Sequence, residues 1–366
     1  MPTRRTFIQQ AAVVSAMTLI APHLRAATRG GFYMPDEGET HRQAFIAFGA
    51  QDAIWEDFTA DVQAALGRIA RAIAAYEPVT VFCREDERSL AEKHCGTRNI
   101  NFVETALDDI WMRDTGANFV IDGAGTQRAV DFNFNGWGNK QQHADDALLA
   151  ALVAEETGAK PVRSELVGEG GAIEVDGLGT GIMTESSWIN RNRNPDWSKA
   201  EVEAELKERL GLRKIIWLPG IKGKDITDAH VDFYARFVAP GVVLANLDTD
   251  PESYDHKVTL AHLEILKNAS DADGRPLQVH TVSPPLKPRK NRFSQGNPDF
   301  AAGYINYFVI NGAVIAPEFG DPLADRKALD LLARLYPQRK VLQLNIDAIA
   351  AGGGGIHCVT SHQPLV

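Results

Sequence analysis

Cysteine is scarce in this sequence, and the few cysteines lack the spacing of a metal site. The chain has only Cys83, Cys95 and Cys358, with no Cys-x-x-Cys pair and no Cys/His zinc pattern. An odd number leaves at least one thiol free. Cys83 and Cys95 could pair in an oxidising compartment, but they flank a predicted helix, so we expect two buried free thiols.

Positive charge is also in short supply. Lysine and arginine total 38 against 48 aspartates and glutamates, which gives a formal net charge of −10. An acidic chain repels nucleic acid and anionic lipid, so we expect neither as a partner. The same balance favours a small cationic ligand. The sequence has no low-complexity tract, and its hydrophobic content is that of a globular protein.

The N-terminal region lacks an apolar run long enough to span a bilayer comfortably. Its apolar stretch, 11–22, follows Thr3-Arg4-Arg5-Thr6-Phe7-Ile8 and precedes the small residues Ala26-Ala27. This order is typical of a twin-arginine export signal. We therefore predict a signal over residues 1–27, a periplasmic protein without a stable membrane anchor, and a single domain over 28–366. The alternative is an ordinary N-terminal extension of a cytoplasmic protein.

Short strands and amphipathic helices alternate through the rest of the chain. The recurring order is strand, hairpin strand, helix, strand, and four rounds can be read from apolar spacing and turn residues. One such unit cannot bury its own apolar face, so several should pack around a common centre. The predicted helices cover 58–73, 144–157, 199–210, 254–267 and 322–335. The predicted strands cover 79–82, 119–121, 129–134, 215–218, 231–237, 242–245, 277–282, 304–310, 313–316 and 341–344.

The C-terminal segment Gly352-Gly353-Gly354-Gly355-Ile356-His357-Cys358 carries the strongest chemical signal. Four successive glycines cost conformational entropy on folding, and they allow a backbone to approach a ligand closely. A thiol beside them is a candidate nucleophile if its thiolate is stabilised. In an extended segment His357 points away from Cys358, which makes it a poor general base. The alternative is a flexible surface loop with a spectator thiol.

The segment Asp228-Ala229-His230-Val231-Asp232 is predicted to enter a strand. In a strand, His230 and Asp232 project from the same face. A histidine beside a carboxylate suits acid/base chemistry or metal ligation, but no HExxH or equivalent motif supplies further ligands. A surface strand with alternating polar residues is the alternative.

Two further segments carry carboxylates with potential chemical roles. Asp108-Asp109-Ile110-Trp111-Met112-Arg113-Asp114 combines three acids with an aromatic ring, which suits a planar cation with an apolar tail. Gly168-Glu169-Gly170-Gly171 contains a glutamate that could orient His230. By default, the first segment is a charged loop and the second is a turn or the start of a strand.

The order of these motifs resembles that of the agmatine deiminase family, part of the guanidine-modifying superfamily and related to bacterial peptidylarginine deiminases. The resemblance covers nearly all of the chain after the predicted signal. It implies an α/β fold, a five-bladed α/β propeller of pseudo-fivefold ββαβ units, although the pattern alone reveals four rounds. The supporting segments are Met34-Pro35-Asp36-Glu37, Phe134-Asn135-Gly136-Trp137-Gly138, Asn190-Arg191-Asn192-Arg193-Asn194-Pro195, Trp217-Leu218-Pro219-Gly220 and Phe319-Gly320-Asp321-Pro322-Leu323-Ala324-Asp325.

The resemblance also implies roles for the site residues. Cys358 would attack the central guanidinium carbon while Asp114 and Asp232 hold the guanidinium nitrogens. His230, supported by Glu169, would protonate the departing ammonia and then activate water to hydrolyse the thiouronium intermediate. The substrate-binding set also contains Trp111, along the methylene chain, and Gly355. No metal or organic cofactor is implied.

The implied reaction converts agmatine and water to N-carbamoylputrescine and ammonia. The alternatives are deimination of peptidylarginine or another small guanidine, and a non-catalytic guanidine-binding protein. Two positions depart from the family pattern: Ile226 stands where agmatine deiminases usually have glutamate, and Gly355 where they usually have asparagine. The missing acid weakens the expectation that the distal ammonium of agmatine is recognised. The oligomeric state, including a homo-oligomer, stays open.

Overall fold

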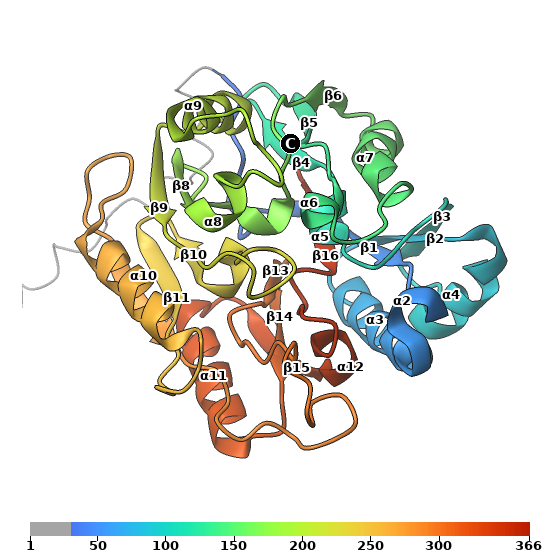
Figure 1. Cartoon of the computed structure of the whole chain (residues 1–366). Coiled ribbons are helices and arrows are strands. Elements are labelled where there is room, and N and C mark those ends of the chain that lie inside the picture. Colours follow the sequence, from blue (N-terminus) through green and yellow to red (C-terminus); the bar gives the residue numbers. More distant parts are fainter. Residues whose placement is uncertain (1–30) are drawn as a thin grey trace, which may run out of the picture.

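The computed structural model describes residues 31–366, so the predicted export signal lies outside the described residues. In residues 31–366 the strands form five small mixed sheets, one with four strands and the others with three. Figure 1 shows these sheets grouped around the middle of the molecule, with the longer helices on the outside. The predicted α/β class is therefore confirmed.

Each of four sheets is built from one continuous ββαβ segment. In one of them β7 (Glu174–Val175) pairs antiparallel with β8 (Thr180–Thr184), which pairs parallel with β9 (Lys214–Leu218) after α9 (Lys199–Leu210). A capping box between Ser198 and Glu201 begins α9, and Gly211 ends it in the left-handed conformation. The other three sheets repeat this order. One consists of β4 (Asn118–Ile121), β5 (Gln127–Asp131), α7 (Leu149–Thr157) and β6 (Lys160–Arg163), and the next of β10 (Ala235–Ala239), β11 (Val242–Asn246), α10 (His256–Asn268) and β12 (Gln278–Val282). The last consists of β13 (Phe308–Ile310), β14 (Ala313–Glu318), α11 (Pro322–Leu335) and β15 (Lys340–Asn345).

The fifth sheet joins the two ends of the described chain. Its strand order is β16-β1-β2-β3, with β16 (Thr360–Pro364) antiparallel to β1 (His41–Phe48), and β2 (Val79–Cys83) and β3 (Ile100–Glu104) continuing in parallel. α3 (Thr59–Ala74) connects β1 to β2, and α4 (Arg88–Cys95) connects β2 to β3. The first strand of this unit follows Cys358 at the far end of the chain, which explains why sequence pattern revealed four rounds rather than five.

Short helical turns fill the connections between the units. They are α2 (Asp52–Trp55), η1 (Glu56–Phe58), η2 (Glu85–Glu87), α5 (Met112–Thr115), α6 (Gly136–Asn139), η3 (Asp146–Leu148), η4 (Gly170–Ala172), α8 (Glu185–Trp188), η5 (Val231–Phe233) and α12 (Asp347–Ala350). Several of them carry site residues. The predicted strands over 231–237 and 304–310 were wrong at their starts, because β10 begins only at Ala235 and β13 only at Phe308.

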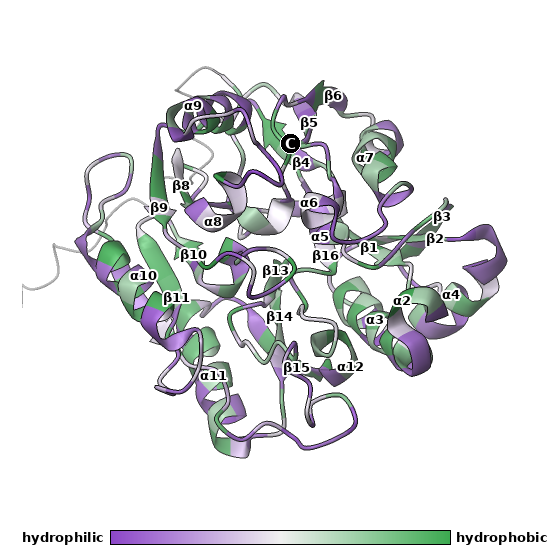
Figure 2. Ribbon diagram, viewed as in Figure 1, coloured by the Kyte–Doolittle hydropathy of each residue, from purple (hydrophilic) through white to green (hydrophobic). Residues whose placement is uncertain are grey.

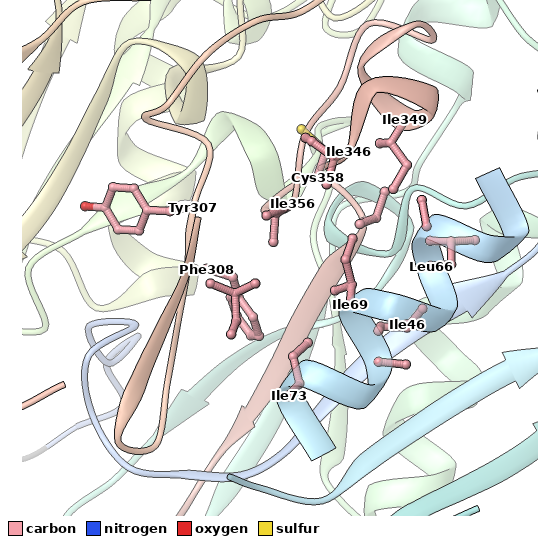
Figure 3. Close-up of a cluster of buried hydrophobic side chains, with 14 of the residues drawn as sticks. Ile46, Leu66, Ile69, Ile73, Tyr307, Phe308, Ile346, Ile349, Ile356 and Cys358 are labelled. Atoms are coloured by element: carbon pink, nitrogen blue, oxygen red, sulfur yellow. The ribbon is translucent and has the colours of Figure 1, made fainter. Parts of the chain in front are cut away.

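The largest apolar core lies between α3 and the sheets at both ends of the chain. Leu66, Ile69 and Ile73 of α3 are fully buried there, and each such side chain contributes roughly 1.5–3 kcal/mol to folding. Figure 3 shows Ile346, Ile349 and Ile356 in the same cluster, with Cys358 beside them. Figure 2 shows the complementary pattern on the outer helices, which carry both hydrophilic and hydrophobic residues.

The predicted state of two cysteines can be compared with this fold. Cys83 and Cys95 are both free and buried, as predicted. Within residues 31–366, no helix is both long and apolar enough to cross a membrane.

Candidate active site

A cavity of about 520 Å³ opens near the middle of the molecule. Cys358 lies in its wall together with Asp114, His230 and Asp232, and these residues come from three of the connections between strands of different sheets. Farther along, the wall is formed by Asp225, Ile226, Asp248, Tyr254, Asp255, Leu286, Asp299 and Phe300. The cavity therefore brings together most of the residues singled out from the sequence.

The Cys358 thiol is only 7% exposed and is held by a neighbouring amide. Asn306 Nδ2 donates to Sγ at 3.3 Å, and Asn306 Oδ1 accepts the backbone N–H groups of His357 and Cys358 at 2.9 and 3.3 Å. Burial, followed by the charges of Asp232 and Asp114, raises the pKa of Cys358 well above its ordinary value. The unliganded site thus favours the protonated thiol.

The glycine run is a packing requirement at this site. A Cβ on Gly354 would overlap the indole of Trp111, and a Cβ on Gly355 would overlap the side chain of Asn306. Residues 354–358 are buried, so the alternative of a flexible surface loop was wrong. Gly355 itself lies outside the cavity wall, but its backbone N–H faces the sulfur of Cys358 and lowers the thiol pKa slightly against the stronger effect of burial.

Asp114 and Asp232 are two buried carboxylates facing the same space. Asp114 accepts hydrogen bonds from Gly171 N and Trp137 Nε1, both at 2.9 Å. Asp232 Oδ2 contacts His357 Nδ1 at 2.8 Å, whereas its Oδ1 has no hydrogen-bond partner among the described residues. Burial raises the pKa of Asp114. The pKa of Asp232 is lowered overall, because His357, His230 and Arg236 outweigh burial. Such a pair suits a planar cation.

His230 lies at the start of a 3₁₀ turn and not in a strand, so the predicted reason for its position beside Asp232 was wrong. Asp228 and Ala229 before it adopt left-handed conformations, with φ of 62° and 68°. Asp225 stabilises this bend by accepting the backbone N–H groups of Thr227 and Ala229 at 2.7 and 3.1 Å. The turn still directs His230 and Asp232 into one cavity, so the surface-strand alternative does not hold.

Glu169 holds the far side of the His230 ring. Its Oε2 lies 3.2 Å from His230 Nε2, and Arg193 Nε contacts both Glu169 oxygens at 2.8 and 2.9 Å. Although burial opposes it, the charges of Asp114, Glu169 and Asp232 raise the pKa of His230 to about 9. His230 Nδ1 has no hydrogen-bond partner in the described chain. Near neutral pH the ring is therefore an imidazolium, and its Nδ1 lies 3.6 Å from Asp114 Oδ1 at the cavity wall.

The segment from Asp108 to Asp114 contains both structural residues and residues of the cavity wall. Trp111 lines the cavity, and its Nε1 donates to Asp109 Oδ2 at 2.8 Å, while Trp55 donates to the other Asp109 oxygen at 2.6 Å. Asp108 accepts the backbone N–H of Asp145 at 2.7 Å. Asp108 and Asp109 are thus buried supports and Asp114 faces the cavity, which rules out the charged-loop alternative.

Three residues that contact Cys358, Glu169 or His357 were not assigned roles from the sequence. Asn306 carries no motif at all, whereas Arg193 and Glu37 were seen only as parts of supporting segments. His357 does not line the cavity; its ring contacts Asp232 and Glu37. No group of three or more His, Cys, Asp or Glu side chains in residues 31–366 is arranged to hold a metal ion.

Comparison with known proteins gives matches over nearly the whole described chain. The family model for Porphyromonas-type peptidyl-arginine deiminase matches residues 33–364. A putative agmatine deiminase of Streptomyces coelicolor is 40% identical over 343 residues, covering 91% of this chain and 99% of that protein. An agmatine deiminase of Stutzerimonas stutzeri is 38% identical over 353 residues, covering 91% and 96%. The structure of the agmatine deiminase of Enterococcus faecalis superimposes with a TM-score of 0.86 at 30% identity, covering 94% and 97%.

Proposed function

The chain belongs to the Porphyromonas-type peptidyl-arginine deiminase family and is an agmatine-deiminase-like hydrolase of C–N bonds in linear amidines, and we propose that it deiminates agmatine through a covalent intermediate on Cys358. The observation that carries this proposal is the convergence on one cavity of a thiol and of two polar atoms that lack a hydrogen-bond partner among the described residues. They are the Cys358 sulfur, Asp232 Oδ1 and His230 Nδ1. They fit an electrophilic carbon, a guanidinium N–H group and a departing nitrogen.

The first half of the reaction forms a thiouronium. Guanidinium binding between Asp114 and Asp232 places a positive charge beside the sulfur, which offsets their effect on the Cys358 pKa and favours loss of the thiol proton to solvent. The thiolate then forms a bond to the guanidinium carbon. His230 donates its proton to one terminal nitrogen, the C–N bond breaks and ammonia leaves.

The second half returns the enzyme to its starting state. His230, now neutral, takes a proton from water as the water oxygen forms a bond to the same carbon. The C–S bond then breaks as the new hydroxyl group loses its proton, and the released thiolate of Cys358 takes up a proton, so that the product carries a neutral ureido group and the thiol is restored. With agmatine the product is N-carbamoylputrescine. Glu169 keeps the ring in place during both proton transfers.

An ammonia-release assay tests this proposal. Purified protein should release ammonia from agmatine and form one equivalent of the ureido product. Free arginine, a peptidylarginine and a simple alkylguanidine form the comparison panel. A preference for the peptide would favour the peptidylarginine alternative. Tight agmatine binding without turnover would instead identify a guanidine-binding protein and would contradict the catalytic proposal.

We further propose that the five sheets are the blades of a five-bladed α/β propeller with pseudo-fivefold ββαβ units. The support is the shared strand order of all five sheets, with an antiparallel first pair and a parallel second pair. Pairing of β16 with β1 would then complete the ring. Superposition of the units on one another by successive rotations of about one fifth of a turn would test this symmetry.

Substrate specificity also depends on how the cavity recognises the second charge of agmatine, its distal ammonium. Ile226 lines the cavity but also packs against the main core cluster. Asp228, an alternative acceptor for the ammonium, is bound by Arg193 and Lys140 at 2.9 and 2.7 Å and does not line the cavity. Asp225 lines the cavity, but both its oxygens accept backbone N–H groups. The cavity thus has Ile226 where relatives usually have glutamate, and its remaining acids away from Cys358 include Asp248, Asp255 and Asp299.

Ile226→Glu should raise kcat/KM for agmatine relative to an uncharged alkylguanidine. The gain should be about tenfold if charge-assisted pairing recovers about 1.4 kcal/mol. Ile226→Gln is the matched control, because it adds a similar polar side chain without the charge. Steady-state kinetics on both substrates provide the measurement. A strong agmatine preference in the native protein, unchanged by Ile226→Glu, would show that another acceptor meets the ammonium.

We propose that residues 1–27 direct export by the twin-arginine route to the periplasm. The support is the sequence order of paired arginines, apolar stretch and small residues. A fusion of residues 1–30 to a folded reporter should be exported, and joint replacement of Arg4 and Arg5 by lysine should block it. Cell fractionation measures both. Unchanged export of the double variant would argue against this route.

A further inference from the structure

A chain of buried charged groups lies behind the wall of the active-site cavity. Asp232 Oδ2 contacts His357 Nδ1 at 2.8 Å, and His357 Nε2 contacts Glu37 Oε2 at 2.9 Å. Asp232 is fully buried and His357 is 2% exposed. Glu37 and His357 do not line the cavity, and Asp232 is the cavity residue that the His357 ring contacts.

Glu37 is fixed from several directions. Its Oε2 also contacts Arg113 Nη2 at 2.8 Å, and its Oε1 contacts Arg236 Nη2 at 2.6 Å and accepts the backbone N–H of Val309 at 3.0 Å. Although burial opposes ionisation, Arg236, His357 and Arg113 lower the pKa of Glu37 well below its ordinary value. Glu37 is therefore a rigid carboxylate beneath His357.

The His357 ring lies between two carboxylates. Both contacts can be hydrogen bonds only when both ring nitrogens carry protons. Burial, then Arg113 and Arg236, lower the pKa of His357, while Glu37 and Asp232 act in the opposite direction. Glu37 and Asp232 thus both favour the doubly protonated ring, which donates to Asp232 and Glu37 at once, against the lowering by burial and the two arginines. Without that donor, Asp232 Oδ2 would keep only the long contact from the Cys358 thiol, which donates to it at 3.5 Å, and Oδ1 has no partner among the described residues.

The backbone of the same segment is also held in place. Arg113 Nε donates to His357 O at 3.3 Å, and Arg113 N donates to Cys358 O at 3.1 Å. Because His357 immediately precedes Cys358, its side chain links the nucleophile's segment to Asp232. One oxygen of Asp232 is taken up by this link and the other faces the cavity unpaired.

We propose that His357 and Glu37 are positioning residues that clamp Oδ2 of Asp232 and so present its Oδ1 to the substrate guanidinium. This inference rests on the proposed deiminase function. The clamp acts mainly on binding of the cation, because Asp232 holds the substrate while Cys358 and His230 perform the bond changes. Loss of the clamp should therefore raise KM more than it lowers kcat.

His357→Leu and His357→Asn form the decisive pair of variants. Leucine removes the donor, whereas the asparagine amide places an N–H donor near the position of Nδ1. With agmatine as the probe, the leucine variant should raise KM by about tenfold to a hundredfold, the loss expected for a hydrogen bond to a charged group. The asparagine variant should recover most of that loss. A core variant, Ile73→Ala, should lower Tm without changing KM.

The part played by Glu37 is tested by a double-mutant cycle. Glu37→Gln should raise KM for agmatine when His357 is present, and should add nothing in the His357→Leu background, because Glu37 acts through His357. The native protein must release ammonia from agmatine, or the proposed function itself fails. If it does so, unchanged KM in His357→Leu, equal KM in the leucine and asparagine variants, or additive effects of Glu37→Gln would overturn the clamp.

Discussion

Replacement of Cys358 by serine is expected to abolish ammonia release while agmatine still binds. A serine hydroxyl is a far weaker nucleophile than a thiolate. His230 is already protonated near neutral pH, since its pKa is raised to about 9. The rate should fall on the order of 10⁴-fold or more, as when other covalent enzymes lose their nucleophile. Calorimetric titration with agmatine should show retained binding, because Asp114 and Asp232 are unchanged.

Cys83 and Cys95 serve as matched controls for this variant. Both are buried in the core between α3, α4 and the β16-β1-β2-β3 sheet, and neither lines the cavity. Burial raises their pKa values to about 11 and about 12, respectively, so neither is a reactive thiolate. Cys83→Ala and Cys95→Ala should therefore keep the native kcat while losing some stability. Substantial turnover by Cys358→Ser would refute its assignment as the nucleophile.

The repeated ββαβ unit could be predicted from the sequence because each unit is local. The helix over Lys199–Leu210 was predicted with its observed bounds, since Ser198 and Gly211 mark its ends in the sequence itself. The fifth unit could not be predicted in this way. Its β16 and β1 are separated by most of the chain, and apolar periodicity carries no information about which distant strands pair.

The site was predicted more completely than the contacts that support it. The order of four motifs identified the family, which the family match confirmed. Asn306 reaches Cys358 across 52 positions, and one asparagine among apolar residues carries no signal of that contact. For His230 and Asp232 the predicted convergence was right but the strand was wrong. Consecutive left-handed residues at Asp228 and Ala229 form a turn that alternating polarity cannot reveal.

These contacts leave both Cys358 and His230 protonated at neutral pH. Cys358 has its pKa raised well above the ordinary value, and His230 has its pKa raised to about 9, so both carry their protons near neutral pH. The reactive form of the enzyme has a Cys358 thiolate and a His230 imidazolium, so it carries one proton fewer than the form in which both residues are protonated. The fraction of enzyme in that form should increase with pH over the range in which most molecules carry both protons.

The pH dependence of kcat/KM for agmatine should therefore rise by about tenfold per pH unit through the neutral range and stop rising near pH 9. Below pH 9 the logarithm of kcat/KM rises by about one for each pH unit, because one proton must be lost to form the thiolate–imidazolium pair. Above about 9 the imidazolium itself begins to lose its proton, so the reactive fraction no longer increases. A fall should follow only at the higher pKa of the coupled pair. A plateau beginning near pH 7 would contradict the assigned protonation states.

Two variants separate the contribution of His230 from that of its carboxylate neighbour. His230→Gln cannot protonate the departing nitrogen, so kcat should fall by about 10²- to 10⁴-fold. Its residual kcat/KM should keep rising past pH 9, because only the thiol then titrates. Glu169→Gln removes a charge that favours the imidazolium, so the pKa of His230 should fall and the rise should end about one pH unit lower or more. An unchanged break point in Glu169→Gln would mean that Glu169 does not control the proton on His230.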